Sequence, residues 1–206
     1  YRLIIKDKPT LFSHYFLHLD KVSLLIGLKM KGIIFSEFLD LVEETFGLEV
    51  CQKMLDDNND DGAYTSVGTY DHKNLVKLII SLSKLTNISI EDLQQVYGKS
   101  VFLTLYNSMP SLEGKSSNTF DFIKQVESYI HLEVKKLYAQ ASPPEFVFIS
   151  NTESEMVMDY ISARCFSNVC FGLIQGCAEH FNENIDIKMQ AIQKDGSQVR
   201  FTLLKV

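Results

Sequence analysis

The sequence predicts one α+β domain, in which an N-terminal helical part is followed by a mostly antiparallel four-stranded sheet with an inserted helix. Apolar residues recur at helical spacing from Ile34 to about Tyr138, whereas beyond Pro143-Pro144 they alternate with a period of two. The chain has 206 residues, which is enough for one sizeable core and marginal for two.

The composition is that of an ordinary globular protein, with 46% hydrophobic and 22% charged residues. The net charge of −6 disfavours nucleic acid as a partner, because neutralising phosphates requires a basic patch. No apolar run is long enough to span a membrane. Three of the four cysteines fall in one predicted helix, so we expect reduced thiols and a cytoplasmic protein.

Five helices are predicted in the first part. Gly47 stands where a glycine commonly ends a helix, Asp71 can cap one, and Ser89 with Asp92 resembles a capping box. The predicted spans run from Ile34 to Gly47, from Leu48 to Leu55, from Asp71 to about Leu85, from Ser89 to about Tyr106, and from Asn118 or Thr119 to about Tyr138. A turn-rich loop from Met109 to Ser117 precedes the last of them.

The second part contains the predicted strands. Asn151 to Ser154 and Lys194 to Ser197 have the composition of hairpin turns, and each separates two runs of strand-like residues. The predicted strands are Phe146 to Ile149, Met156 to Arg164, Ile185 to Ile192 and Val199 to Val206, with a helix from Cys165 to His180 inserted after the second.

One face of the predicted strand Met156 to Arg164 ends in a phenol, a hydroxyl and a guanidinium. Tyr160, Ser162 and Arg164 share this face because side chains on a strand alternate. Two hydroxyl donors and a bidentate cation suit a pair of carboxylates. The alternative is an ordinary exposed strand face.

His131 is the candidate metal ligand on the last predicted helix of the first part. Glu127 precedes it by one turn, and the apolar Ile130 and Val134 lie beside it. A neutral imidazole at an apolar edge can ligate a metal, although a half-buried, hydrogen-bonded histidine is the alternative. The acidic run Asp56 to Gly62 resembles a calcium loop, but Gly68 takes the place of the required bidentate glutamate.

Several fragments together carry a family resemblance. They are Met30-Lys31-Gly32-Ile33-Ile34-Phe35, Gly62 to Tyr70, Tyr97-Gly98, Ile130 to Tyr138, Tyr160-x-Ser162-x-Arg164, and Gly172-Leu173-Ile174-Gln175-Gly176. In this order and spacing they resemble the haem–nitric oxide/oxygen binding (H-NOX) family, and specifically its stand-alone bacterial type. The match predicts one haem-binding domain over residues 30–206, with residues 1–29 as an extension or leader. It also implies a structural loop, not a calcium site, at Gly62.

The resemblance implies a haem b cofactor, iron protoporphyrin IX. His131 would be the proximal iron ligand, Tyr160, Ser162 and Arg164 would bind the propionates, and Pro144 would press on the haem and hold it out of plane. The residues that the resemblance assigns to the distal wall are Ile34, Phe38, Val101, Leu105 and Val169, with Phe166 and Leu173 as neighbours.

The resemblance also predicts the gas and the mechanism. Val169 stands where O2-binding members have a tyrosine, so an apolar pocket would favour NO, unless a tyrosine such as Tyr106 reaches it. NO binding would release His131 and signal in trans to a histidine kinase or a cyclic-di-GMP enzyme.

The sequence leaves two alternatives to a sensor of NO. An O2-binding or redox-sensing haem protein of the same fold is the alternative sensor, and a haem-free module that binds an apolar ligand is a further one. The sequence has no P-loop, dinucleotide fingerprint, nucleophile elbow or HExxH motif, and no histidine or arginine at the predicted distal positions, so we expect no enzyme.

Overall fold

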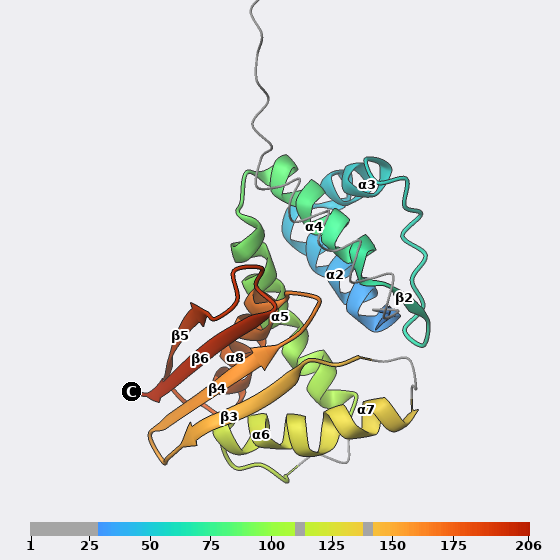
Figure 1. The fold of residues 1–206 in the computed structure, drawn as a ribbon. Coiled ribbons are helices and arrows are strands. Elements are labelled where there is room, and N and C mark those ends of the chain that lie inside the picture. The colour runs from blue at the N-terminus through green and yellow to red at the C-terminus, as the bar shows by residue number, and fades with distance from the viewer. Residues whose placement is uncertain (1–28, 110–113, 138–141) are drawn as a thin grey trace, which may run out of the picture.

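The computed structural model describes residues 29–109, 114–137 and 142–206, shown as the coloured ribbon in Figure 1. The predicted leader therefore lies outside the described residues, except for Lys29. The helical part contains α2 (Gly32–Phe46), α3 (Leu48–Asp56), α4 (His72–Thr86) and α5 (Ile90–Asn107). β1 (Lys29–Lys31), just before α2, pairs antiparallel with β2 (Thr69–Asp71), just before α4. The sequence patterns did not indicate this short ribbon.

The predicted helix caps are confirmed. The Asp71 carboxylate accepts a hydrogen bond from the Lys73 amide at 2.9 Å, and the Ser89 hydroxyl accepts one from the Asp92 amide at 3.0 Å. Each cap satisfies an amide that the first turn of a helix leaves unpaired. Helices α4 and α5 therefore begin where the sequence predicted.

The second part is a four-stranded antiparallel sheet in the order β3-β4-β6-β5. Its strands are β3 (Glu145–Asn151), β4 (Glu155–Ile161), β5 (Ile185–Ala191) and β6 (Gln198–Lys205), and α8 (Ser167–His180) is inserted between β4 and β5. Helices α6 (Thr119–Gln125) and α8 bury apolar side chains against one face of this sheet. The predicted α+β architecture is confirmed (Figure 1).

The prediction that the second strand extends to Arg164 was wrong. β4 ends at Ile161, opposite Gln198 at the start of β6, so the residues beyond it have no partner strand. The chain turns instead: the Cys165 amide donates to the Ser162 carbonyl at 3.2 Å. Cys165 has a φ of 56°, which is incompatible with a right-handed helix, so α8 begins at Ser167 and not at Cys165.

The helix predicted from residue 118 or 119 to about 138 is interrupted. After α6 the chain forms a π-helical segment, η2 (Val126–Ile130), and α7 (His131–Leu137) follows. The His131 amide donates to the Val126 carbonyl, five residues earlier, which is the π-type hydrogen bond. Tyr138, the predicted helix end, lies outside the described residues.

Helices α5 and α8 cross at glycines. A Cβ atom on Gly98 would lie 2.2 Å from the Val169 carbonyl oxygen, and one on Gly172 would lie 2.0 Å from the Gln95 carbonyl oxygen. Both positions therefore require glycine, because the backbones themselves are in contact. This crossing joins the helical part to the helix that covers the sheet.

Candidate functional site

His131 is held in a defined orientation at the start of α7. The residue is 8% exposed, and its Nδ1 atom lies 2.9 Å from Oε2 of Glu127. When Nδ1–H donates to this carboxylate, the lone pair of Nε2 is left available to a metal ion. Burial lowers the pKa of His131 below its ordinary value, although the hydrogen bond to Glu127 acts in the opposite direction. The neutral, ligating form is therefore favoured.

The trio predicted to bind carboxylates gathers at the end of β4. Tyr160 is buried, and burial raises the pKa of its phenol, while a hydrogen bond with Ser162 and the charge of Arg164 act in the opposite direction. The Ser162 hydroxyl also accepts a hydrogen bond from the Arg164 amide at 3.2 Å. The turn after Ile161, and not the alternation of an extended strand, brings Arg164 to this place.

The guanidinium of Arg164 has an N–H group without a hydrogen-bond acceptor among the described residues. One terminal nitrogen donates to the Lys29 carbonyl at 3.0 Å, but the buried Nε atom has no partner. Desolvation lowers the pKa of its guanidinium. Among the residues that the structure describes, no carboxylate forms an ion pair with Arg164. Arg164 as a residue is half-buried, and a buried N–H group of a cation without an acceptor is costly, so this position suits an anionic ligand.

Phe146 joins His131 to the trio. Its ring centroid lies 5.3 Å from that of His131 and 6.2 Å from that of Tyr160, its partner across the β3–β4 pair. The charge of Arg164 is one of the smaller influences that lower the pKa of His131, after burial. Pro144 is half-buried and lies two residues before Phe146. The ligand candidate and the anion trio thus form one site.

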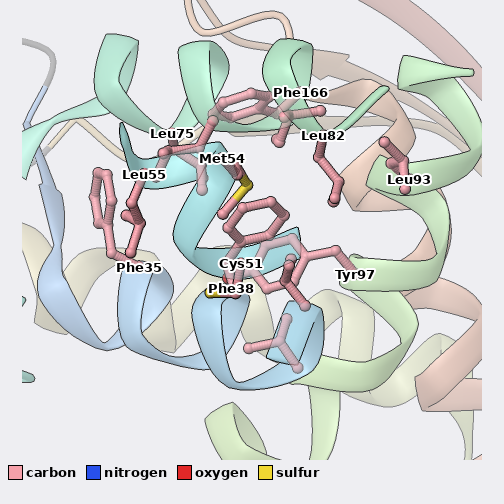
Figure 2. Packing of buried hydrophobic residues seen from close by; sticks show 14 residues of the cluster. Phe35, Phe38, Cys51, Met54, Leu55, Leu75, Leu82, Leu93, Tyr97 and Phe166 are labelled. Carbon is pink, nitrogen blue, oxygen red and sulfur yellow. The ribbon is translucent and has the colours of Figure 1, made fainter. Parts of the chain in front are cut away.

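Two of the predicted distal residues, Phe38 and Val101, belong to what we call the helical cluster, the apolar core formed by α2, α3, α4 and α5 with Phe166. Figure 2 shows the packing of this cluster, including Phe38 and Phe166. Phe38 and Val101 are fully buried in it, and Phe38 contacts the Tyr97 ring edge-on, with centroids 5.4 Å apart. The remaining predicted residues are half-buried and pack against this cluster: Ile34, Leu105, Val169 and Leu173.

Every tyrosine of the helical cluster has its hydroxyl group in a hydrogen bond. Tyr97 donates to the Ile34 carbonyl at 2.6 Å, and Tyr64 donates to Asp60. The Tyr70 hydroxyl accepts from the Thr65 amide at 2.9 Å. The Tyr70 hydroxyl also donates to the Ala63 carbonyl at 3.5 Å, so each of these three phenol protons has an acceptor.

Tyr106, the tyrosine that could have weakened the prediction of an apolar pocket, packs elsewhere. Its ring lies 4.5 Å from that of His180 and 5.5 Å from that of Phe122, in a separate apolar cluster around Phe102.

Sequence reasoning missed two features of this site. Phe146 was assigned only to a strand, and its contact with His131 depends on the sheet. Glu127 was recognised as one turn from His131, a spacing at which helical side chains meet. Its second hydrogen bond, from the Phe146 amide at 3.0 Å, has no local signal in the sequence. In the acidic loop, Asp60 and Asp61 accept hydrogen bonds from the loop's own amides.

Comparison with known proteins gives a consistent result. Residues 31–189 match the family model described as Haem-NO-binding. The structure is similar to that of the unliganded Fe(II) H-NOX protein from K. algicida, with 37% identity, a TM-score of 0.81 and coverage of 86% of this chain and 97% of that one. No curated protein matches the chain at a significant level.

Two further H-NOX structures are similar. One is the Shewanella woodyi protein bound to IWP-051 in the Fe(II)CO state, with 32% identity, a TM-score of 0.74, and 86% of this chain and 95% of that one covered. The other is the S. oneidensis protein in the Fe(II)NO state, with 25% identity, a TM-score of 0.77, and 86% of this chain and 99% of that one covered. Within the described part of the chain, no helix is long and apolar enough to span a bilayer.

Proposed function

This chain belongs to the haem-NO-binding (H-NOX) family, and from this premise we propose that it is a sensor of nitric oxide that signals by releasing His131. Membership of the family makes the chain a haem-binding gas-sensor domain, and the family is not catalytic. The choice of gas, the role of each residue and the partner are our proposal.

The residues fit a haem. Among the described residues, no three His, Cys, Asp or Glu side chains are grouped to hold a metal ion, so His131 suits an iron whose other ligands a porphyrin supplies. The unpartnered Nε of Arg164 suits a propionate, to which Tyr160 and Ser162 would also donate. When bound, the ferrous haem supplies the iron to which the gas coordinates.

One observation supports NO as the gas. In the described structure, each tyrosine hydroxyl of the helical cluster, against which Val169 packs, already donates to a protein acceptor. Bound O2 acquires negative charge and is stabilised by a hydrogen-bond donor, which NO needs much less. Tyr97, the buried tyrosine in contact with Phe38, donates its hydroxyl hydrogen bond to the backbone carbonyl of Ile34. The pocket therefore discriminates against O2 by withholding a donor.

His131 is the element that moves. Its Nε2 atom would hold a haem iron while Nδ1 is oriented by Glu127, so loss of the iron bond would free the imidazole and the start of α7. Pro144, immediately before β3, would press on the bound haem while His131 holds it. These two arrangements are the states that a partner distinguishes.

We propose that the signalling partner is a separate protein, either a histidine kinase or a cyclic-di-GMP enzyme. The compartment is the cytoplasm, which the four free cysteines of the structure support. A change in the autophosphorylation of such a kinase, or in cyclic-di-GMP turnover, on adding NO to this chain would support the partner assignment. Identical enzyme rates with the unliganded and NO forms would contradict it.

Absorption spectroscopy of the purified protein tests the function. We expect a Soret band, a spectrum typical of five-coordinate haem after NO is added to the ferrous protein, and no stable oxygen-bound spectrum in air. His131→Gly is the matched variant, and added imidazole should restore its ferrous spectrum. A protein without a Soret band, or with a stable oxygen-bound form, would overturn the proposal.

A further inference from the structure

Glu127 connects the candidate iron ligand to the sheet. Its Oε2 atom is 2.9 Å from Nδ1 of His131 and 3.0 Å from the amide nitrogen of Phe146, the second residue of β3. We propose that Glu127 is a positioning residue whose single carboxylate oxygen orients His131 and transmits its release to strand β3. This inference rests on the proposed function, because it concerns the same site.

The two hydrogen bonds join segments that are otherwise separate. Glu127 and Phe146 are 19 residues apart, and residues 138–141 between them lie outside the described structure. In the described residues, no lysine or arginine forms an ion pair with Glu127. Its carboxylate therefore serves the imidazole and the strand amide, and a charged acceptor makes both bonds stronger than neutral ones.

The backbone around Glu127 is also unusual. Glu127 lies in η2, and the π-type hydrogen bond from the His131 amide to the Val126 carbonyl closes that segment directly at the ligand. Single π-turns are rare and occur frequently at functional sites. Here the wider turn lies between the residue that orients the imidazole and the imidazole itself, so its geometry sets how both side chains meet.

A shared acceptor couples its two donors. With His131 held by a haem iron, its Nδ1–H would keep the carboxylate in the position that also receives the Phe146 amide. When His131 moves, the carboxylate must either follow the imidazole or remain with the strand. If it follows, its bond to the Phe146 amide at the second residue of β3 breaks, which is the transmission that we propose; if it remains, only the bond to His131 is lost.

Two variants of Glu127 and one control test this. E127A removes the acceptor, and E127Q keeps the shape but replaces the charged acceptor with a neutral one. E133Q is the control, since Glu133 lies on the same helical stretch and pairs with exposed Lys136 at 2.8 Å instead of with His131. The Soret band of each protein reports haem binding independently of the coupling.

The first readout is the iron–histidine stretching band in the resonance Raman spectrum of the ferrous protein. We expect it to shift to lower frequency in E127Q and further in E127A, and to stay at the wild-type position in E133Q. Because removing a partner of a ligating histidine typically weakens the metal site 10- to 100-fold, E127A should also lose haem to apomyoglobin at least about tenfold faster.

The second readout is hydrogen–deuterium exchange of the peptide covering residues 142–151. NO should accelerate exchange in wild type and E133Q, whereas in E127A exchange should already be fast and unaffected by NO. If E127A does not fold, the same comparison is made with E127Q. A wild-type Soret band with unchanged Raman and exchange behaviour in the Glu127 variants would overturn this inference alone. A wild-type protein without a Soret band would overturn the proposed function with it.

Discussion

The hydroxyl group of Tyr97 donates a hydrogen bond of 2.6 Å to the backbone carbonyl oxygen of Ile34, and so joins α5 to the first turn of α2. Burial raises the pKa of this phenol, with a smaller contribution from the negative charge of Glu37, so its proton is retained. The bond commits the tyrosine hydroxyl that lies beside Phe38 to the backbone. A structural role for this phenol is consistent with a pocket that selects NO.

Tyr97→Phe should therefore affect stability and not gas binding. Loss of one buried hydrogen bond is expected to lower the free energy of unfolding by about 1 kcal/mol. Urea denaturation measures this change, and stopped-flow mixing with NO and O2 measures the binding. A tenfold change in O2 dissociation on this substitution would show that the Tyr97 hydroxyl faces the gas.

Val169→Tyr should create an affinity for O2. On the proposed assignment of Val169 to the distal wall, a phenol at this position would give bound O2 a hydrogen-bond donor, and one hydrogen bond corresponds to roughly a tenfold slower dissociation. Val169→Phe is the matched control, because it adds the ring without the hydroxyl group. Flash photolysis of the oxygenated proteins compares the rates, and equal rates in the two variants would contradict the assignment of Val169 to the distal wall.

Pro144→Ala should flatten the haem and partly mimic the NO-bound protein. Proline has a fixed φ and a rigid ring, and alanine at this half-buried position removes that rigidity. Out-of-plane modes in the resonance Raman spectrum should weaken in the ferrous, unliganded variant. Pro143→Ala serves as the control, and unchanged modes in Pro144→Ala would count against this role of Pro144.

Arg164→Leu should act with opposite signs on the protein with and without haem. In the apoprotein the guanidinium is desolvated and its Nε lacks a partner, so an apolar residue should stabilise the fold by about 1 kcal/mol. With haem, the variant loses the cation that pairs with a propionate and should release haem faster. Thermal denaturation of both forms checks the signs, and a destabilised apoprotein with normal haem retention would contradict the propionate role.

Asp159→Asn should make stability less dependent on pH in acid. Hydrogen bonds from Arg200, at 2.7 and 2.9 Å, hold the pKa of the buried Asp159 below its ordinary value. Because the folded-state pKa is lowered, the ion pair contributes stability above the unfolded value, near 3.9, and loses it as pH falls through the folded value.

At neutral pH this variant should be less stable by about 2 kcal/mol, and the difference from wild type should shrink below about pH 4. Urea titrations between neutral and acid pH measure it. Asp186→Asn is the control, because Asp186 is half exposed in its pair with Lys188 and should contribute at most about 0.5 kcal/mol. A constant difference between Asp159→Asn and wild type across this range would show that the Asp159 charge is not involved.

Features encoded within a few neighbouring residues were predictable from the sequence. The caps at Asp71 and Ser89, the change of period after Pro144 and the order of the elements depend on local hydrogen bonding and on which residues are apolar. The convergence of Tyr160, Ser162 and Arg164 was also predicted, although the turn at Cys165 produces it and not a longer strand.

Only the tertiary structure decided the contacts that make these residues a site. Strand β4 ends at Ile161 because β6 begins opposite it, and the acceptor of the Phe146 amide is a carboxylate 19 residues away. The Tyr97 hydroxyl meets a carbonyl 63 residues distant, and packing leaves the Nε of Arg164 buried without a partner. Each of these depends on two segments that packing brings together, so no pattern within one segment of the sequence contains it.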